Sequence, residues 1–320
     1  MNLIIELNNF HEEVLYGEYC NNNNSIILTS LKNYEKGLFN KIASEKKIEL
    51  SISKNIFILV YQLISIIKKY NISTITFITC ERKFEQIIFI LTKFFFINRR
   101  FHRYSHNIPI SIYSLLKSPI ELFIILLCNK NYVIDDRVKL KVLSYKFCYR
   151  EVFYGLYKNV LDLNFPANFN FSNEDIYITI IGTISFKRRN YKSLQTEISK
   201  INNPNVKFIF LTNYKSDDGL EFYQEIQNSQ FRDRFVFFDF YLSYSEFCKI
   251  IDISQASALL FDHSVPLMND YANNKVSSAV KFSEEFNKIL LVSDEFKLKL
   301  KSKIIYYKGS YISEAINMLF

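Results

Sequence analysis

Glycine and proline are scarce in this sequence of 320 residues, with six and five copies. Each glycine is therefore expected to mark a constrained backbone position. Apolar residues make up 49% of the chain and aromatic residues 17%, which is ample material for packed cores and excludes a mainly disordered protein. At about 150 residues per domain, the length predicts two domains.

Cysteine is also sparse and shows no CxxC pair. We expect free, buried thiols in a reducing compartment at the five scattered positions, Cys20, Cys80, Cys128, Cys148 and Cys248. The four histidines are not spaced with them as ligands, so no bound metal is expected.

Long hydrophobic runs are missing. The nearly uncharged run Asn55–Ile67 is shorter than the roughly 18–20 residues that span a bilayer, and Lys93 interrupts the run "QIIFILTKFFFI". The start, "MNLIIELNNFHEEV", has too short an apolar part for a secretory signal and soon becomes acidic. We expect core helices in a cytoplasmic protein, with the inner face of the cytoplasmic membrane as a candidate peripheral location.

Several nucleotide and hydrolase motifs are absent. The sequence contains no GxxxxGK[ST] phosphate loop, no GxGxxG and no GxSxG. These absences count against a P-loop NTPase, a dinucleotide-dependent oxidoreductase and an α/β-hydrolase.

The net charge of +8 favours an anionic partner, which could be a membrane surface, a nucleic acid or a phosphorylated ligand. Two basic stretches, "NRRFHRYSH" from Asn98 and "KLKLKSK" from Lys297, suit lipid headgroups or single-stranded nucleic acid. A solvated edge is the commoner explanation of either stretch, and the second could also be an edge strand protected by lysines.

Strands and helices alternate about six times after Asp175, a pattern typical of a doubly wound parallel α/β sheet. The first half shows the same pattern less clearly. We predict two Rossmann-like domains facing across a cleft, an acceptor-side domain at 1–165 and a donor-binding domain at 172–320. The polar stretch Leu163–Asp175 lies between them, and the last helix is a candidate to pack back on the first domain.

The stretch "YITIIGTISFKRRNYKSL" raises an electrostatic question. A strand ends at Gly182, and Lys187, Arg188 and Arg189 then cluster at a helix start, where the backbone dipole disfavours cations. A bound diphosphate would relieve this repulsion, and the preceding hydroxyls of Thr183 and Ser185 could help to bind it. The simpler alternative is a solvated basic turn.

A second anion site is predicted at the start of a later helix. Lys275 precedes Ser277 and Ser278 there, where free backbone N–H groups and hydroxyls could bind phosphate. Helix capping by a serine is the alternative.

Loops of the first domain supply further candidates. His11 and Glu12 follow the first strand, where His11 could act as a general base and Glu12 could instead complement the helix dipole. His106 and Asn107 could hydrogen-bond a sugar or phosphate, or simply form a turn.

These segments resemble the GT-B glycosyltransferases of bacterial cell-surface polysaccharide biosynthesis. "ITIIGTISFKRRNY" is similar to the first loop of their C-terminal domain, and "YANNKVSSAVKFSEEFNKILLVSDEF" to their donor-site segment. "LSYSEFCKIIDISQASALLFD" fits the segment between, and "NNFHEEVLY" and "YSHN" look like their N-terminal loops. The resemblance implies a metal-independent hexosyltransferase with no cofactor, a nucleotide-sugar donor and a lipid-linked glycan acceptor.

The resemblance also implies roles for single residues. Donor binding would involve Gly182, Thr183, Ser185, Lys187, Arg188, Arg189, Tyr191, Lys275, Ser277 and Ser278. Catalysis would involve His11 and Glu12, and the acceptor or cleft His106 and Asn107.

The sequence departs from the family pattern in places. Glu284 and Glu285 have no acidic partner at the Glu-x7-Glu spacing, and Ile289 stands where a proline is common, so the sugar and the stereochemistry stay open. Two other classes also stay open: a basic nucleic-acid-binding protein and a catalytically inactive GT-B-like partner subunit.

Overall fold

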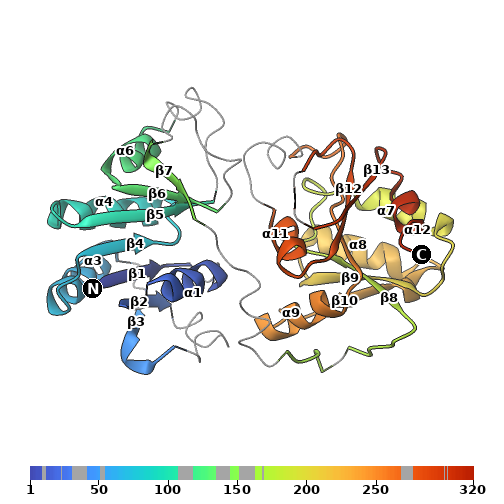
Figure 1. Ribbon diagram of the computed structural model, residues 1–320, viewed down its shortest axis with the longest axis horizontal. Coiled ribbons are helices and arrows are strands. Elements are labelled where there is room, and N and C mark those ends of the chain that lie inside the picture. Colours follow the sequence, from blue (N-terminus) through green and yellow to red (C-terminus); the bar gives the residue numbers. More distant parts are fainter. Residues whose placement is uncertain are drawn as a thin grey trace. The chain divides into compact units, whose positions relative to one another are not determined.

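The computed structural model describes residues 1–8, 12–22, 24–30, 42–50, 55–106, 118–134, 145–150, 163–167, 169–267, 277–298, 300 and 302–320. The chain forms two compact units, Met1–Phe153 with Asn273–Val276, and Tyr154–Ala272 with Ser277–Phe320. Each unit is built on one parallel sheet with helices on its faces (Figure 1).

The sheet of the first unit has seven strands in the order β3-β2-β1-β4-β5-β6-β7. All its pairs are parallel. Its strands are β1 (Asn2–Glu6), β2 (Ser25–Ser30), β3 (Lys47–Leu50), β4 (Thr74–Phe77), β5 (Arg100–Ser105), β6 (Lys130–Val133) and β7 (Phe147–Tyr149). Its helices are α1 (Glu12–Asn21), the 3-10 turn η2 (Ser44–Lys46), α3 (Ile56–Lys69), α4 (Lys83–Phe95) and α6 (Pro119–Leu127).

Helix α3 shows how sequence pattern sets this packing. The side chain of Asn55 accepts a hydrogen bond from the Phe57 amide at 2.9 Å and caps the helix. Leu59, Leu63 and Ile67 recur at helical spacing and are buried against the sheet. At about 25 cal/mol per Å², burying one leucine side chain contributes roughly 2 kcal/mol.

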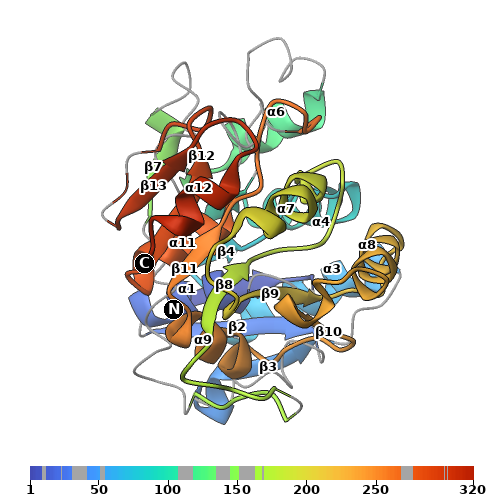
Figure 2. The ribbon, with the colours of Figure 1, turned by 90° about the vertical axis from the view of Figure 1, so that its right-hand side faces the viewer.

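The sheet of the second unit has six parallel strands in the order β10-β9-β8-β11-β12-β13. Its strands are β8 (Ile176–Ile180), β9 (Val206–Asn213), β10 (Phe235–Phe238), β11 (Ala256–Ala258), β12 (Ile289–Ser293) and β13 (Ile304–Tyr307). Its helices are α7 (Tyr191–Glu197), η6 (Ile198–Lys200), α8 (Asp217–Gln227), η7 (Arg232–Arg234), α9 (Tyr244–Ile253), α11 (Ser278–Glu285) and α12 (Ile312–Asn317). Figure 2 shows α7 and α12 side by side over this sheet.

The predicted fold class is confirmed, because both units are doubly wound and parallel. Helix α9 begins with a capping box formed by Ser243 and Glu246. Helix α12 packs on α7, β12 and β13 of its own unit. The predicted domain bounds stay a prediction.

Beyond Arg100, the interpretation of "NRRFHRYSH" as a surface stretch is wrong. Residues 100–105 form β5, between β4 and β6, and Phe101, Arg103 and Tyr104 are buried. A central strand covered by helices cannot present alternating basic and aromatic groups to a nucleic acid. In "KLKLKSK", Leu298 is buried and the next described strand, β13, begins only at Ile304.

The five cysteines are free thiols, and three of them, Cys80, Cys128 and Cys248, are buried. Burial raises the pKa of the Cys128 thiol to about 12, despite the nearby Arg103 cation. Among the helices that the structure describes, none is long and apolar enough to cross a membrane.

Candidate functional site

The order of strands in the second sheet reverses between β8 and β11. Strands β9 and β10 follow β8 on one side, and β11 to β13 lie on the other. Ligands of doubly wound sheets bind outside the carboxyl ends of the strands at such a switch point. The loops that leave β8 and β11 at this edge, residues 181–190 and 259–267, are the candidate site.

Gly182 makes the turn out of β8 with a φ of +105°. A Cβ at this position would lie 2.6 Å from Nη2 of Arg189. Glycine therefore serves two purposes here, since it adopts a backbone conformation that strains other residues and leaves room for the arginine.

Arg189 points back into the loop and is only 6% exposed. Its guanidinium donates hydrogen bonds to the carbonyl oxygens of Ile181 at 2.6 Å and Thr183 at 2.8 Å. Its Nε makes no hydrogen bond, and the Phe261 ring lies 5.7 Å from the guanidinium carbon. Arg189 therefore fixes the shape of the loop, and its predicted contact with a diphosphate stays a prediction.

Tyr191, at the first position of α7, strengthens the same turn. Its hydroxyl donates to the carbonyl oxygen of Thr183 at 3.4 Å. Burial raises the pKa of this phenol, and the neighbouring Arg189 cation opposes the rise. The tyrosine is buried, so the structure gives it a role within the loop.

Arg188 has the opposite environment, because it is exposed. Together with Thr183 and Ser185 it lines a cavity of about 310 Å³ that also borders the first turn of α8. Asp218 of α8 closes one side, where its carboxylate accepts a hydrogen bond from the Phe186 amide at 2.9 Å. The cavity is lined by the hydroxyl residues Thr183, Ser185 and Ser216, the forked cation of Arg188, and the carboxylates of Asp217 and Asp218. Its hydroxyls and its arginine are groups that bind phosphate.

The loop after β11 is joined to the loop after β8. The Asn190 amide donates to the Leu260 carbonyl at 2.7 Å, and the Asn190 side chain donates to Asp262 at 2.6 Å. The Leu267 amide donates to the carbonyl oxygen of Lys187, itself an exposed cation, at 3.2 Å. These bonds hold the two loops of the switch point as one unit.

A histidine and a glutamate extend this edge toward β12. The His263 amide donates to Glu295 at 2.7 Å, and the His263 ring Nε2 lies 3.7 Å from the other carboxylate oxygen. The histidine side chain is 74% exposed, so its ring is accessible to a ligand. The loop sequences after β11 and β12 therefore contribute groups that the sequence analysis missed.

The positions of Asp262, His263 and Glu295 in the sequence could have indicated that they belong to this edge. Asp262 and His263 end the apolar run "SALLF", and Glu295 follows "ILLVS". Polar residues immediately after buried strands of a parallel sheet fall at its carboxyl edge.

The start of α11 holds the predicted serines. Ser277 is the N-cap residue, is buried, and makes no capping hydrogen bond with its side chain, whereas Ser278 is exposed. Helix α11 contacts β11 and β12 and follows β11, so its N-terminus lies at the same edge as Gly182. Lys275 lies outside the described residues, and the phosphate role of all three stays a prediction.

The first unit gives less information on its candidates. His11 and Asn107 lie outside the described residues, and Glu12 is the first residue of α1. His106 directly follows β5, and its amide donates to Glu81 at 3.0 Å while its ring Nε2 lies 3.0 Å from the Ile78 carbonyl oxygen. This histidine is tied to the loop after β4, and its predicted role toward an acceptor stays a prediction.

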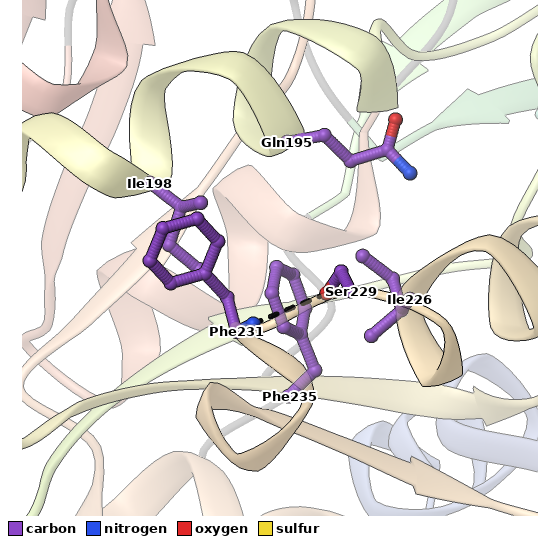
Figure 3. Close-up of a pocket in the computed structure, with 6 residues that line it drawn as sticks. All are labelled: Gln195, Ile198, Ile226, Ser229, Phe231 and Phe235. Carbon is purple, nitrogen blue, oxygen red and sulfur yellow. Dashed lines mark hydrogen bonds between the residues drawn. The ribbon is translucent and has the colours of Figure 1, made fainter.

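A different cavity lies at the opposite edge of the second sheet, lined by the end of α7, η6, the end of α8 and the start of β10 (Figure 3). It has a volume of about 120 Å³, and Ile198, Ile226, Phe231 and Phe235 make it apolar. None of the described residues that line it is ionisable, so it does not suit an anionic ligand. Among the described residues, no group of three His, Cys, Asp or Glu could hold a metal ion.

Solved structures with a similar fold are known. The chain is similar to a glycosyltransferase from Rickettsia africae, with a TM-score of 0.61 and 13% identity over 100% of this chain and 87% of that one. It is similar to HepE from Anabaena in complex with UDP, with a TM-score of 0.62 and 10% identity over 99% and 89%.

It is also similar to a UDP-N-acetylglucosamine 2-epimerase from Rickettsia bellii, with a TM-score of 0.57 and 11% identity over 100% and 87%. No protein-family model matches the sequence, and neither does any curated protein. At these identities the likeness concerns the fold: the chain has the GT-B fold of glycosyltransferases and sugar-nucleotide epimerases.

Proposed function

We propose that the protein is a glycosyltransferase that moves a hexose from a nucleotide-sugar donor to an acceptor, which is a lipid-linked surface glycan. The observation that carries the proposal is the braced cationic loop 181–190 at the switch point of the second sheet. The likeness in fold to HepE, which was solved with UDP, supports a nucleotide donor.

The donor diphosphate would lie against Arg188, Thr183 and Ser185, with Lys187 adding a point charge. The hydrogen bonds that Arg189 donates to Ile181 and Thr183 go to neutral carbonyl oxygens, so those bonds leave its charge uncompensated. That charge adds to the attraction for an anion beside it. Fixed cations that stabilise the departing nucleoside diphosphate would make the largest contribution to lowering the activation free energy.

Further residues complete the proposed site. Lys275, Ser277 and Ser278 would bind phosphate or sugar at the start of α11. His263, held by Glu295, would hydrogen-bond the donor from the loop after β11. On the first unit, His11 and Glu12 would act in catalysis, and His106 and Asn107 would contact the acceptor. The protein is proposed to need no metal and no cofactor, since the nucleotide-sugar is a substrate.

Thermal shift with UDP, GDP, CDP and dTDP tests donor binding. One nucleotide present at about 100 times its Kd should stabilise the protein by about 2.7 kcal/mol. The Arg188→Ala variant should lose at least about tenfold in affinity for that nucleotide, because it removes a forked donor. Arg232→Ala is the matched control, since Arg232 is also exposed but lies at the other edge of the sheet.

Product analysis separates this function from the alternatives. A transferase releases nucleoside diphosphate and moves labelled sugar to a lipid-extractable acceptor. An epimerase, which the likeness to the Rickettsia bellii protein favours as a second candidate, returns a labelled sugar epimer. Salt-dependent oligonucleotide binding without nucleotide binding would support the nucleic-acid hypothesis. Full transferase activity of the Arg188→Ala variant would contradict the proposed donor site.

A further inference from the structure

The first unit exposes a row of large apolar side chains on three neighbouring helices. Helix α4 packs between α3 and α6, and Figure 1 shows α3 and α4 on the face of the sheet away from α1. Phe57 and Tyr61 of α3 are 78% and 72% exposed. The outer helix face is defined here by Phe57, Tyr61, Phe94, Phe95, Phe123 and Leu126, all of them exposed.

Two of the three helices are joined on the outer helix face by a ring contact. The rings of Phe94 on α4 and Phe123 on α6 have centroids 6.5 Å apart. Helix α3 has no charged residue between Ile56 and Ile67. Large exposed apolar side chains gathered on neighbouring helices mark a contact with another surface.

Acidic groups around this face are bound within the protein. Residues 55–106 and 118–134 contain three acidic side chains, at 81, 85 and 121. Glu121 forms an ion pair with the buried Arg103 at 2.5 Å. Glu85 accepts hydrogen bonds from the amides of Glu81 and Arg82, and Glu81 accepts one from the His106 amide.

Basic groups gather where the three helices end. Lys68 and Lys69 end α3, and Arg100 and Lys130 begin β5 and β6 at the same edge of the sheet, all of them exposed. The Arg99 guanidinium donates to the Asn71 side chain at 3.0 Å, which joins the turns after α3 and α4.

The turn between α4 and β5 is firmly held. The buried Lys93 ammonium donates to the Ile97 carbonyl at 3.0 Å and to the Arg99 carbonyl at 2.9 Å. We call Lys68, Lys69, Arg100 and Lys130 the basic rim. This turn holds Arg100 of the basic rim at a fixed place beside the outer helix face.

We propose that the outer helix face docks the protein on an anionic lipid bilayer. Its aromatic side chains enter the headgroup region, and the basic rim contacts lipid phosphates. The inference rests on the proposed function in one respect: docking on a bilayer would bring the protein to its lipid-linked acceptor. Because the face runs along the helices, the carboxyl edge of the first sheet stays uncovered beside the membrane.

Charge favours a bilayer over a second copy of the chain. Self-association through this face would bring equal basic rims together, and the described acidic groups near it already have partners within the protein. An anionic surface complements the rim directly, at about fivefold in affinity for each lysine or arginine near the lipid.

Vesicle sedimentation of the full chain tests the inference. The protein should bind phosphatidylglycerol–phosphatidylcholine vesicles at low salt and bind pure phosphatidylcholine at least about tenfold more weakly. The variants Phe57→Gln/Tyr61→Gln/Phe94→Gln and Lys68→Gln/Lys69→Gln/Arg100→Gln should each lose at least about tenfold. Vesicle binding by the Lys68→Gln/Lys69→Gln/Arg100→Gln variant should also depend less on salt concentration.

The matched control is Tyr241→Gln/Tyr311→Gln, which removes two exposed tyrosines of the second unit. Equal losses in control and test variants, or unchanged binding in both test variants, would overturn the inference. A solution dimer that dissociates in the aromatic variant, without vesicle binding by the wild type, would assign the face to a second copy instead.

Nucleotide thermal shift on the same samples keeps the two proposals apart and reports folding of the variants. Nucleotide binding without vesicle binding overturns the docking surface alone. Vesicle binding without nucleotide binding overturns the donor site alone.

Discussion

The two arginine-rich stretches of this chain look alike in sequence and differ in the fold. In 99–103 the chain enters a central strand, so Arg100 is exposed at the edge of the sheet and Arg103 is buried. In 187–189 the chain forms a loop, where Arg188 is exposed and Arg189 is buried. Each stretch thus combines one arginine that shapes the protein with one that faces outward.

The two buried arginines are accommodated in different ways. Arg103 donates to Asn131 and pairs with Glu121, so a carboxylate neutralises it. Burial would lower its pKa, and the Glu121 carboxylate more than reverses this effect. Arg189 donates to carbonyl oxygens, which leave the loop positive. We infer that the first arrangement serves stability, whereas the second leaves charge available for an anion.

Replacing Arg103 should have the largest effect. Arg103→Ala removes the charged partner of Glu121 and should lower the free energy of unfolding by about 3–5 kcal/mol. Urea unfolding measures this loss. Arg100→Ala, in the same stretch, should change stability by less than about 0.5 kcal/mol. Equal losses of stability in Arg103→Ala and Arg100→Ala would contradict a stabilising role of the buried Arg103–Glu121 pair.

Closing the space beside Arg189 should have the next effect. Gly182→Ala strains the backbone and places a methyl group against the guanidinium, so it should cost about 2–3 kcal/mol and weaken nucleotide binding. Thermal unfolding and nucleotide titration measure both changes. At Gly309, φ is +53° and no atom lies within 4 Å of an added Cβ, so Gly309→Ala should cost only about 1 kcal/mol. A Gly182→Ala protein with normal nucleotide affinity would contradict the role of loop shape.

Acidification should reveal a smaller effect in the first stretch. Burial, with help from Lys130, Arg150 and Arg100, lowers the pKa of His102 from 6.5 to about 4. The unfolded chain therefore binds this proton first as the pH falls, and stability is lost between pH 6.5 and pH 4. After allowance for solvent screening, the loss from pH 7 to pH 5 is about 1 kcal/mol. Urea unfolding of His102→Gln at both pH values should lack this component, and an unchanged pH dependence would contradict the shift.

The alternation of strands and helices could be predicted from sequence because apolar runs and caps are local signals. Strand β5 was missed as a buried element because its ionisable residues are balanced by partners distant in sequence. Arg103 meets Glu121 eighteen residues later, and Tyr104 donates to the buried Glu18 at 2.6 Å, 86 residues earlier. No local pattern shows such pairs.

The candidate site could be predicted in place but not in detail. The position of Gly182 after a strand indicated the loop. The inward turn of Arg189 depends on carbonyl oxygens brought together by the fold. Asn190 and Asp262 are 72 residues apart in sequence, and they meet because they follow neighbouring strands. The sequence shows which residues are near a strand end, whereas the fold decides which of them face a ligand.

Hydrogen exchange with and without the nucleotide that stabilises the protein most tests the central claim directly. The account predicts slower exchange of backbone amides in residues 182–190 and 260–266, the two loops of the switch point in the second sheet. Slower exchange confined to the amino edge of that sheet, or no change in either loop under saturating nucleotide, would contradict it.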